Sequence, residues 1–271
     1  MPHVQANGQR LYYEVHGEGE PLVCIMGLGG DVSGWRSQVP VFSRWYRTIV
    51  FDNRDVGRSS YAAAPYVIED MAADALGLAD GLALGRFHLL GISMGGAIAQ
   101  QVALAQPERV STLTLCVSYA SAGRMGRDRA RLQADAAAEK SDDALLEELM
   151  LLTLSEAIYE TADDLPAVRE LVLSYPYRQR REGFIRQIRA GATHEAGDRL
   201  AALTMPVHVI GAEQDLLVPV WKSRQLAELI PGARMSVIEG GAHAVNVEHA
   251  REFNALVLEF LRDSRAVRPA F

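Results

Sequence analysis

Ser93 lies at the centre of Gly91-Ile92-Ser93-Met94-Gly95, which follows an apolar run and precedes a stretch with helical spacing. A G-x-S-x-G sequence is typical of a tight strand-to-helix turn that exposes the serine hydroxyl. Small residues are required two positions before and after the serine, because the backbone is strained and the neighbouring chain passes close by. The motif alone also fits an ordinary glycine-rich turn, so its interpretation as a nucleophile depends on partners elsewhere in the chain.

A serine nucleophile needs a general base, and that base needs an acid that orients it. When the serine follows a strand in this way, the order along the chain is Ser, then Asp or Glu, then His. Asp215 comes shortly after the apolar run 207–211, and His243 follows another run that ends at 238. Each alone also fits a helix cap or a surface loop. Together, Ser93, Asp215 and His243 predict a catalytic triad, with Glu213 as a rival acid that is closer to the strand end.

The other histidines fit the role of the base less well. Strand carboxyl ends form the ligand-binding edge of an open α/β sheet, whereas two of these histidines are near strand starts. We assign His88 and His208 to strand starts, His3 and His16 to an N-terminal hairpin, His194 to an insertion at 118–204 and His249 to the final helix.

An oxyanion formed on attack by serine needs two N–H donors. The residue after the nucleophile, Met94, is expected to provide one of them. The second is expected from the glycine-rich loop 26–30, where we predict the N–H of Leu28.

The elements that must position these residues follow from alternating strand-like and helix-like segments. A hairpin with its turn at Asn7-Gly8 is expected at the start. This alternation then predicts an α/β fold, with a mostly parallel sheet of roughly eight strands that is flanked by helices. The expected strands include 22–26, 48–51, 87–92, 112–117, 207–211 and 235–238, the expected helices include 69–84, 220–230 and 248–261, and the tail 262–271 is expected to be loosely held.

Residues 118–204 lack strand signals and predict an all-helical cap inserted into the core formed by 1–117 and 205–271. Leucines repeat there at helical spacing, and Pro166 and Pro176 divide the segment. Apolar and aromatic residues of the cap suggest a mainly apolar substrate pocket, although ordinary packing explains any one of them equally well. The expected pocket residues are Gly27, Met125, Met150, Tyr159 and Ala244.

Composition excludes several classes of protein. The 271 residues are 49% hydrophobic, and the net charge of −7 argues against nucleic-acid binding. No apolar signal segment or membrane span is visible, which predicts a cytoplasmic protein without membrane contact. Cys24 and Cys116 lie in apolar runs and are expected to be buried thiols. No metal-ligand spacing occurs, so we expect neither a metal nor another cofactor.

The chain resembles the α/β-hydrolase superfamily over nearly its whole length. The matching segments are MGLGG at 26–30, FDNRDVGRSS at 51–60, GISMGG at 91–96, GAEQD at 211–215 and GGAH at 240–243. Within the superfamily it is similar to small capped bacterial esterases and lactonases, including enol-lactone hydrolases and methylesterases. The resemblance implies a cofactor-free serine hydrolase in which Ser93, Asp215 and His243 match the triad, and Leu28 and Met94 match the oxyanion positions.

Four positions bear on how far the resemblance extends. Met26 stands where many relatives have histidine, and Asp55 stands where they often have glycine. We interpret the segment around Asp55 as structural, with Arg54 supporting the loop. Ala244 stands where carbon–carbon bond hydrolases commonly have an aromatic residue. Haloalkane dehalogenases and epoxide hydrolases would need aspartate in place of Ser93.

These observations predict hydrolysis of a small-molecule carboxylic ester or lactone through an acyl-enzyme. Three alternatives stay open: a hydrolase of carbon–carbon bonds in ring-fission products, a cofactor-free perhydrolase, and a hydrolase-like ligand receptor with slow turnover. Homo-oligomerisation is also left open. The cap, residues 118–204, is expected to determine the substrate.

Overall fold

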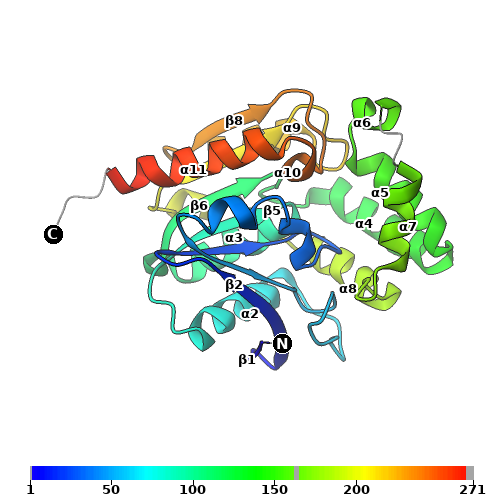
Figure 1. Cartoon of the computed structure of the whole chain (residues 1–271), viewed down its shortest axis with the longest axis horizontal. Coiled ribbons are helices and arrows are strands. Elements are labelled where there is room, and N and C mark those ends of the chain that lie inside the picture. Colours follow the sequence, from blue (N-terminus) through cyan, green and yellow to red (C-terminus); the bar gives the residue numbers. More distant parts are fainter. Residues whose placement is uncertain (1, 162–164, 267–271) are drawn as a thin grey trace.

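The computed structural model describes residues 2–161 and 165–266 and is built on one eight-stranded sheet (Figure 1). The strand order is β1-β2-β4-β3-β5-β6-β7-β8. The β1–β2 and β2–β4 pairs are antiparallel and the others are parallel, which confirms the predicted mostly parallel sheet. The strands are β1 His3–Ala6, β2 Gln9–His16, β3 Pro21–Ile25, β4 Arg47–Phe51, β5 Phe87–Ile92, β6 Val110–Cys116, β7 Val207–Ala212 and β8 Arg234–Ile238.

Helices cover both faces of this sheet. Every residue of β5 and β6 is buried, as is typical of central parallel strands that are covered by helices on both faces. One face packs against α2 (Ile68–Gly81), α3 (Met94–Ala105) and α9 (Val220–Leu229), and the other against α1 (Val39–Phe42) and α11 (Ala250–Ala266). The short helices η1 Val32–Trp35, η2 Pro107–Arg109 and α10 Val245–Glu248 complete this part of the chain.

The C-terminal helix differs from the sequence prediction. The expected helix 248–261 corresponds to α11, which begins at Ala250; Glu248 is the last residue of the separate helix α10, and His249 lies between the two helices rather than on the final one. Residues 262–266, expected to be loosely held, continue α11. The helix continues this far because residues on one of its faces stay buried against the core, among them Phe260 and Ser264. Residues 267–271 of the expected tail lie outside the described residues.

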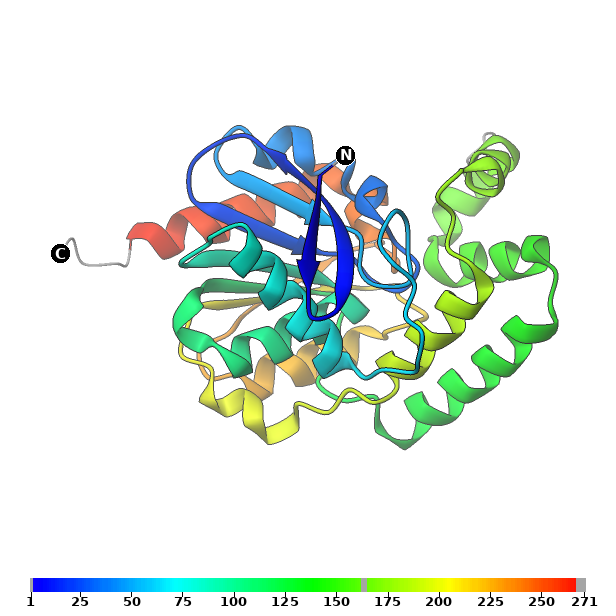
Figure 2. The ribbon, with the colours of Figure 1, turned by 90° about the horizontal axis from the view of Figure 1, so that it is seen from below.

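In chain order, five helices lie between β6 and β7, and they form a group at one end of the sheet (Figures 1 and 2). These helices, called the cap below, are α4 Gly123–Glu139, α5 Asp142–Thr153, α6 Glu156–Thr161, α7 Leu165–Ser174 and α8 Arg181–Gly191. Here α4 and α8 pack together through Ala134, Ala137, Phe184 and Ile188. The 3-10 helix η3, Gly197–Ala202, packs differently, because Leu200 and Leu203 belong to the core beside the sheet. It therefore lies with the sheet, although the expected insertion extended to residue 204.

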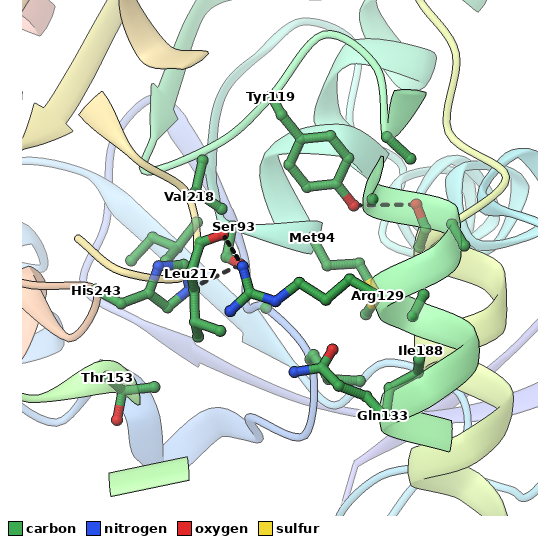
Figure 3. A pocket seen from close by; sticks show the side chains of 18 of the residues that line it. Ser93, Met94, Tyr119, Arg129, Gln133, Thr153, Ile188, Leu217, Val218 and His243 are labelled. Carbon is green, nitrogen blue, oxygen red and sulfur yellow. Dashed lines mark hydrogen bonds between the residues drawn. The ribbon is translucent and has the colours of Figure 1, made fainter. Parts of the chain in front are cut away.

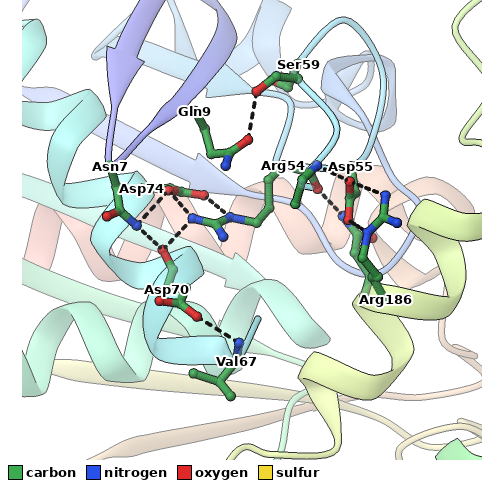
Figure 4. Close-up of polar contacts among 12 residues, drawn as sticks. Asn7, Gln9, Arg54, Asp55, Ser59, Val67, Asp70, Asp74 and Arg186 are labelled. Atoms are coloured by element: carbon green, nitrogen blue, oxygen red, sulfur yellow. Dashed lines mark hydrogen bonds and ion pairs between the residues drawn. The ribbon is translucent and has the colours of Figure 1, made fainter. Parts of the chain in front are cut away.

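A buried ion pair joins the loop after β4 to helix α2 (Figure 4). The guanidinium of Arg54 donates to both carboxylate oxygens of Asp74, at 2.6 Å each, and stacks 4.9 Å from the ring centre of Tyr66. Both charged side chains are almost fully buried. The side chain of Arg54 thus holds α2, whereas the glycine-rich loop 26–30 is supported by its neighbour Asn53, whose Nδ2 donates to the carbonyl of Met26 at 2.9 Å.

Arg54→Met is expected to lower the free energy of unfolding by about 3–5 kcal/mol, because it leaves the buried carboxylate of Asp74 without its cation. Urea titration followed by circular dichroism measures the loss. The double variant Arg54→Met/Asp74→Leu removes both charges and should recover most of it. A loss below about 1 kcal/mol in the single variant would show that the pair contributes only as a surface ion pair does.

Candidate active site

Ser93 occupies a strained turn between β5 and α3. Its backbone has φ +55° and ψ −121°, outside the usual regions for a residue with a side chain. A Cβ atom on Gly91 would overlap the carbonyl of Gly95, and one on Gly95 would overlap the carbonyl oxygen of Ile25. Glycine is therefore required at both positions for the steric reason expected from the motif, and the turn presents Ser93 at the carboxyl end of β5.

Three side chains from distant parts of the sequence form one hydrogen-bonded chain at this edge. The Oγ of Ser93 lies 2.9 Å from Nε2 of His243, and Nδ1 of the same ring lies 2.8 Å from Oδ2 of Asp215. The structure thus brings together all three residues of the predicted triad. Glu213, the rival acid, instead accepts a hydrogen bond from the N–H of Gly240 at 2.9 Å.

The environment of Asp215 determines which way the imidazole is protonated. Its side chain is fully buried, and its Oδ1 accepts the N–H groups of Leu217 and Val218, both at 2.8 Å. These donors leave Oδ2 for the ring, so Nδ1 of His243 must carry a proton and Nε2 is free to accept one. Since Nε2 faces Ser93, the arrangement can remove the serine proton and stabilise the resulting imidazolium.

Two backbone N–H groups are available beside Ser93 for a developing negative charge. Leu28 and Met94, the predicted oxyanion donors, both line the cavity above Ser93. Within the described residues, neither N–H has a protein acceptor. Met94 is also the first residue of α3, where the helix dipole favours negative charge.

Gln187 of α8 is a residue of this site that the sequence analysis missed. Its Oε1 accepts the N–H of Gly29 at 3.0 Å, and its Nε2 donates to the carbonyl of Arg54 at 2.7 Å. The side chain is fully buried and lines the cavity. Gln187, on the cap, therefore holds in place the loop that contains Leu28 and its N–H group. A glutamine on an amphipathic helix carries no motif, so no sequence signal identifies this contact.

Gln187→Met is expected to lower kcat by about 10-fold with little change in KM, because the loop loses the hydrogen bond that fixes the Leu28 N–H. Steady-state kinetics on a short-chain ester measures the two constants separately. Gln133→Met changes another glutamine of the same cavity, one without a hydrogen bond to this loop among the described residues, so it should affect KM rather than kcat. An unchanged kcat in Gln187→Met would show that the loop keeps its geometry without this contact.

Asp55 attaches α8, and with it Gln187, to the sheet domain (Figure 4). Its carboxylate accepts two hydrogen bonds from the guanidinium of Arg186, at 2.7 and 2.9 Å, and its carbonyl accepts from Gln179 at 2.9 Å. The backbone of Asp55 has φ +68°, a left-handed conformation that glycine adopts more readily than a residue with a side chain. This chain uses the position for a buried salt bridge to the cap.

A cavity of about 400 Å³ lies above Ser93, between the sheet edge and the cap (Figure 3). Of the predicted pocket residues, Gly27, Met125 and Ala244 line it. Met150 and Tyr159 do not, and this part of the prediction is wrong. Helix α5 turns Leu149 and Thr153 toward the cavity instead, because the way the helix docks decides which of its faces covers the cavity. The N–H of Ala244 donates to the carbonyl of Thr153 at 2.9 Å, which ties α5 to the histidine loop.

The side chains of His194, His208 and both cysteines take no part in the hydrogen-bonded chain of Ser93, His243 and Asp215. Burial lowers the pKa of His194 and of His208 to about 4 each, so both rings are neutral near pH 7. His194 contacts Gln100, and His208 contacts Ser236. Cys24 and Cys116 are fully buried free thiols whose pKa values burial raises, which makes them poor nucleophiles.

The chain belongs to the α/β-hydrolase fold family, whose model matches residues 20–250. It is 30% identical over 267 residues to a protein of Azorhizobium caulinodans named "Putative carbamate hydrolase RutD", covering 96% of this chain and 98% of that protein. The enol-lactonase from Burkholderia xenovorans LB400 is a structural neighbour with a TM-score of 0.88 and 27% identity, covering 96% of this chain and all of that one. Est816, described as an N-acyl homoserine lactone degrading enzyme, has a TM-score of 0.82 and 28% identity over 96% of this chain and all of its own.

Within the described residues, none of the helices has both the length and the apolar character needed to span a membrane.

Proposed function

We propose that this protein is a serine hydrolase that cleaves a carboxylic ester or a lactone through an acyl-enzyme intermediate. The observation that carries the proposal is the unbroken chain of hydrogen bonds from Ser93 through His243 to Asp215 at the floor of the cavity. Each member has the position and hydrogen-bond partner that its role requires.

In the proposed mechanism, Nε2 of His243 takes the hydroxyl proton as Oγ of Ser93 attacks the substrate carbonyl. Asp215 keeps the ring oriented and stabilises its positive charge. The N–H groups of Leu28 and Met94 bind the oxyanion. His243 then protonates the leaving alcohol, and afterwards it activates a water molecule that releases the acid and regenerates Ser93.

The relatives support two versions of this acyl transfer. The enol-lactonase and Est816 act on lactones according to their names, which favours a lactone or ester as substrate. The carbamate hydrolase name of the relative at 30% identity favours a carbamate as the second candidate. The same oxyanion donors and nucleophile would serve a carbamate carbonyl, so the cavity lining has to discriminate between them.

Initial rates on matched substrates test the proposal. A short-chain 4-nitrophenyl ester, a five-membered lactone and a carbamate of comparable size are compared, with the rate in the presence of wild-type protein measured against buffer. Sustained turnover of the ester or lactone above that of the carbamate supports the proposal. Faster turnover of the carbamate would replace the ester and lactone assignment by the second candidate.

A further inference from the structure

The cavity above Ser93 is lined by positive charge, although the whole chain has a net charge of −7. Among its described lining residues, Arg129 of α4 and Lys222 of α9 are cationic, and none is aspartate or glutamate. Asp215 does not line the cavity, and its buried carboxylate is hydrogen-bonded to His243 and to two backbone N–H groups. Two cations in the binding site would not stabilise a neutral acyl chain through charge–charge attraction.

Arg129 extends from α4 toward Leu217 and the Ser93–His243 pair, as Figure 3 shows. Its Nη1 donates to the carbonyl oxygens of Leu216 and Leu217, at 3.4 and 3.2 Å. Leu217 in turn donates its N–H to Asp215 at 2.8 Å, so the guanidinium contacts the loop whose backbone binds the Asp215 carboxylate.

The remaining donors of Arg129 have no protein partner within the described residues. Neither Nε nor Nη2 donates a hydrogen bond there, and no carboxylate lies within ion-pair distance. Two arginines of α8, by contrast, have acidic partners: Arg186 pairs with Asp55, and Arg181 pairs with Asp142. Nε and Nη2 form the planar fork that binds the two oxygens of a carboxylate.

Lys222 adds a second cation without an acidic partner. Its Nζ donates to the carbonyl of Ser121 at 3.3 Å and lies 5.2 Å from the ring centre of Trp221. Partial burial lowers the pKa of this amine. Removing a cation from water without an anion costs free energy, which a bound anion would offset.

We propose that the cavity binds a substrate that carries a free carboxylate in addition to its ester or lactone bond, with Arg129 holding that carboxylate and Lys222 adding a second positive charge. The inference rests on the proposed function, because it specifies the substrate class of the same site. Met125, Leu149 and Ile188, which also line the cavity, suit a short hydrocarbon segment between the carboxylate and the scissile bond.

Two chain-matched esters test this inference: mono-4-nitrophenyl adipate, which is anionic, and 4-nitrophenyl hexanoate, which is neutral. Arg129→Gln is expected to lower kcat/KM for the adipate by about 10- to 100-fold, mainly through KM, and for the hexanoate by less than about 3-fold. Arg129→Lys should fall between, since it keeps the charge and loses the fork. Lys222→Met should also lower kcat/KM for the adipate more than for the hexanoate.

Arg127→Gln is the matched control, because Arg127 is exposed on the same helix and does not line the cavity. It should change neither ester. Equal losses for both esters in Arg129→Gln would make Arg129 a clasp between α4 and the loop at Leu217, and would overturn the inference. Hydrolysis of the hexanoate with an adipate rate independent of Arg129 would also overturn it, while the proposed function would stand.

A binding measurement decides the inference even if neither ester is turned over. Titration calorimetry of the Ser93→Ala variant is expected to give monomethyl adipate a Kd at least about 10-fold lower than that of methyl hexanoate. Adding Arg129→Gln should abolish the difference. Equal Kd values for the two ligands would contradict the inference, whereas absent turnover with a selective Kd would count against the proposed function alone.

Discussion

Ser93→Ala is expected to lower kcat on a short-chain ester by roughly 10⁶-fold, the scale seen when a triad nucleophile is removed. The variant retains His243 and Asp215 but has no group that can form the acyl-enzyme. The residual rate should be the small acceleration that the oxyanion donors and substrate binding supply without a nucleophile. Steady-state kinetics with a 4-nitrophenyl ester, corrected for spontaneous hydrolysis, measures the loss.

The loss must be separated from a folding defect. Among the described residues, His243 is the one hydrogen-bond partner of the Ser93 Oγ, and the turn itself is held by backbone hydrogen bonds such as Ser93 N–H to the carbonyl of Cys116 at 2.8 Å. The thermal unfolding midpoint of Ser93→Ala should therefore stay close to that of the wild type. A folded variant that keeps most of its esterase activity would exclude Ser93 as the nucleophile.

Asp215→Asn is expected to lower kcat by about 10⁴-fold, because the substitution imposes the wrong histidine tautomer. The N–H groups of Leu217 and Val218 require an acceptor, so the asparagine oxygen must face them. Its NH₂ group then faces Nδ1 of His243, which has to become the acceptor. The proton moves to Nε2, and the ring can no longer accept the proton of Ser93.

Glu213→Gln is the matched control for this effect. Glu213 is an acid on the same loop whose oxygen accepts from Gly240, and a glutamine oxygen can replace it in that contact. We expect kcat to change by less than about 3-fold. Comparable losses in the two variants would show that loop structure, rather than the tautomer of His243, explains the effect of Asp215→Asn.

The sheet and its carboxyl edge could be predicted from the sequence because each depends on local signals. A mainly apolar run marks β5, and β5 and β6 are both buried along their whole length. The glycines around Ser93 reflect contacts with Gly95 and Ile25 that admit no side chain. Since parallel strands present their carboxyl ends together, the residues after β5, β7 and β8 could be brought to one place without knowledge of side-chain geometry.

The cap could be predicted as helical but not in detail. Which face of an amphipathic helix covers the cavity depends on how the helices dock, and a shift of one residue exchanges Met150 for Leu149. Gln187 and Arg129 act through contacts with the loops at Gly29 and Leu217, which are distant in sequence. Such long-range polar contacts leave no periodic pattern. Gln187, Arg129 and the face that α5 turns to the cavity could therefore not be identified from the sequence.

Intact-mass spectrometry of protein quenched with acid during turnover of a 4-nitrophenyl ester tests whether an acyl-enzyme forms on Ser93. We expect a species heavier than the protein by one acyl group, with the modification on the peptide that contains Ser93. Asp215→Asn and Ser93→Ala should not accumulate it. Sustained ester hydrolysis without any acylated species, or acylation at a residue other than Ser93, would contradict the proposed mechanism, in which Ser93 forms the acyl-enzyme.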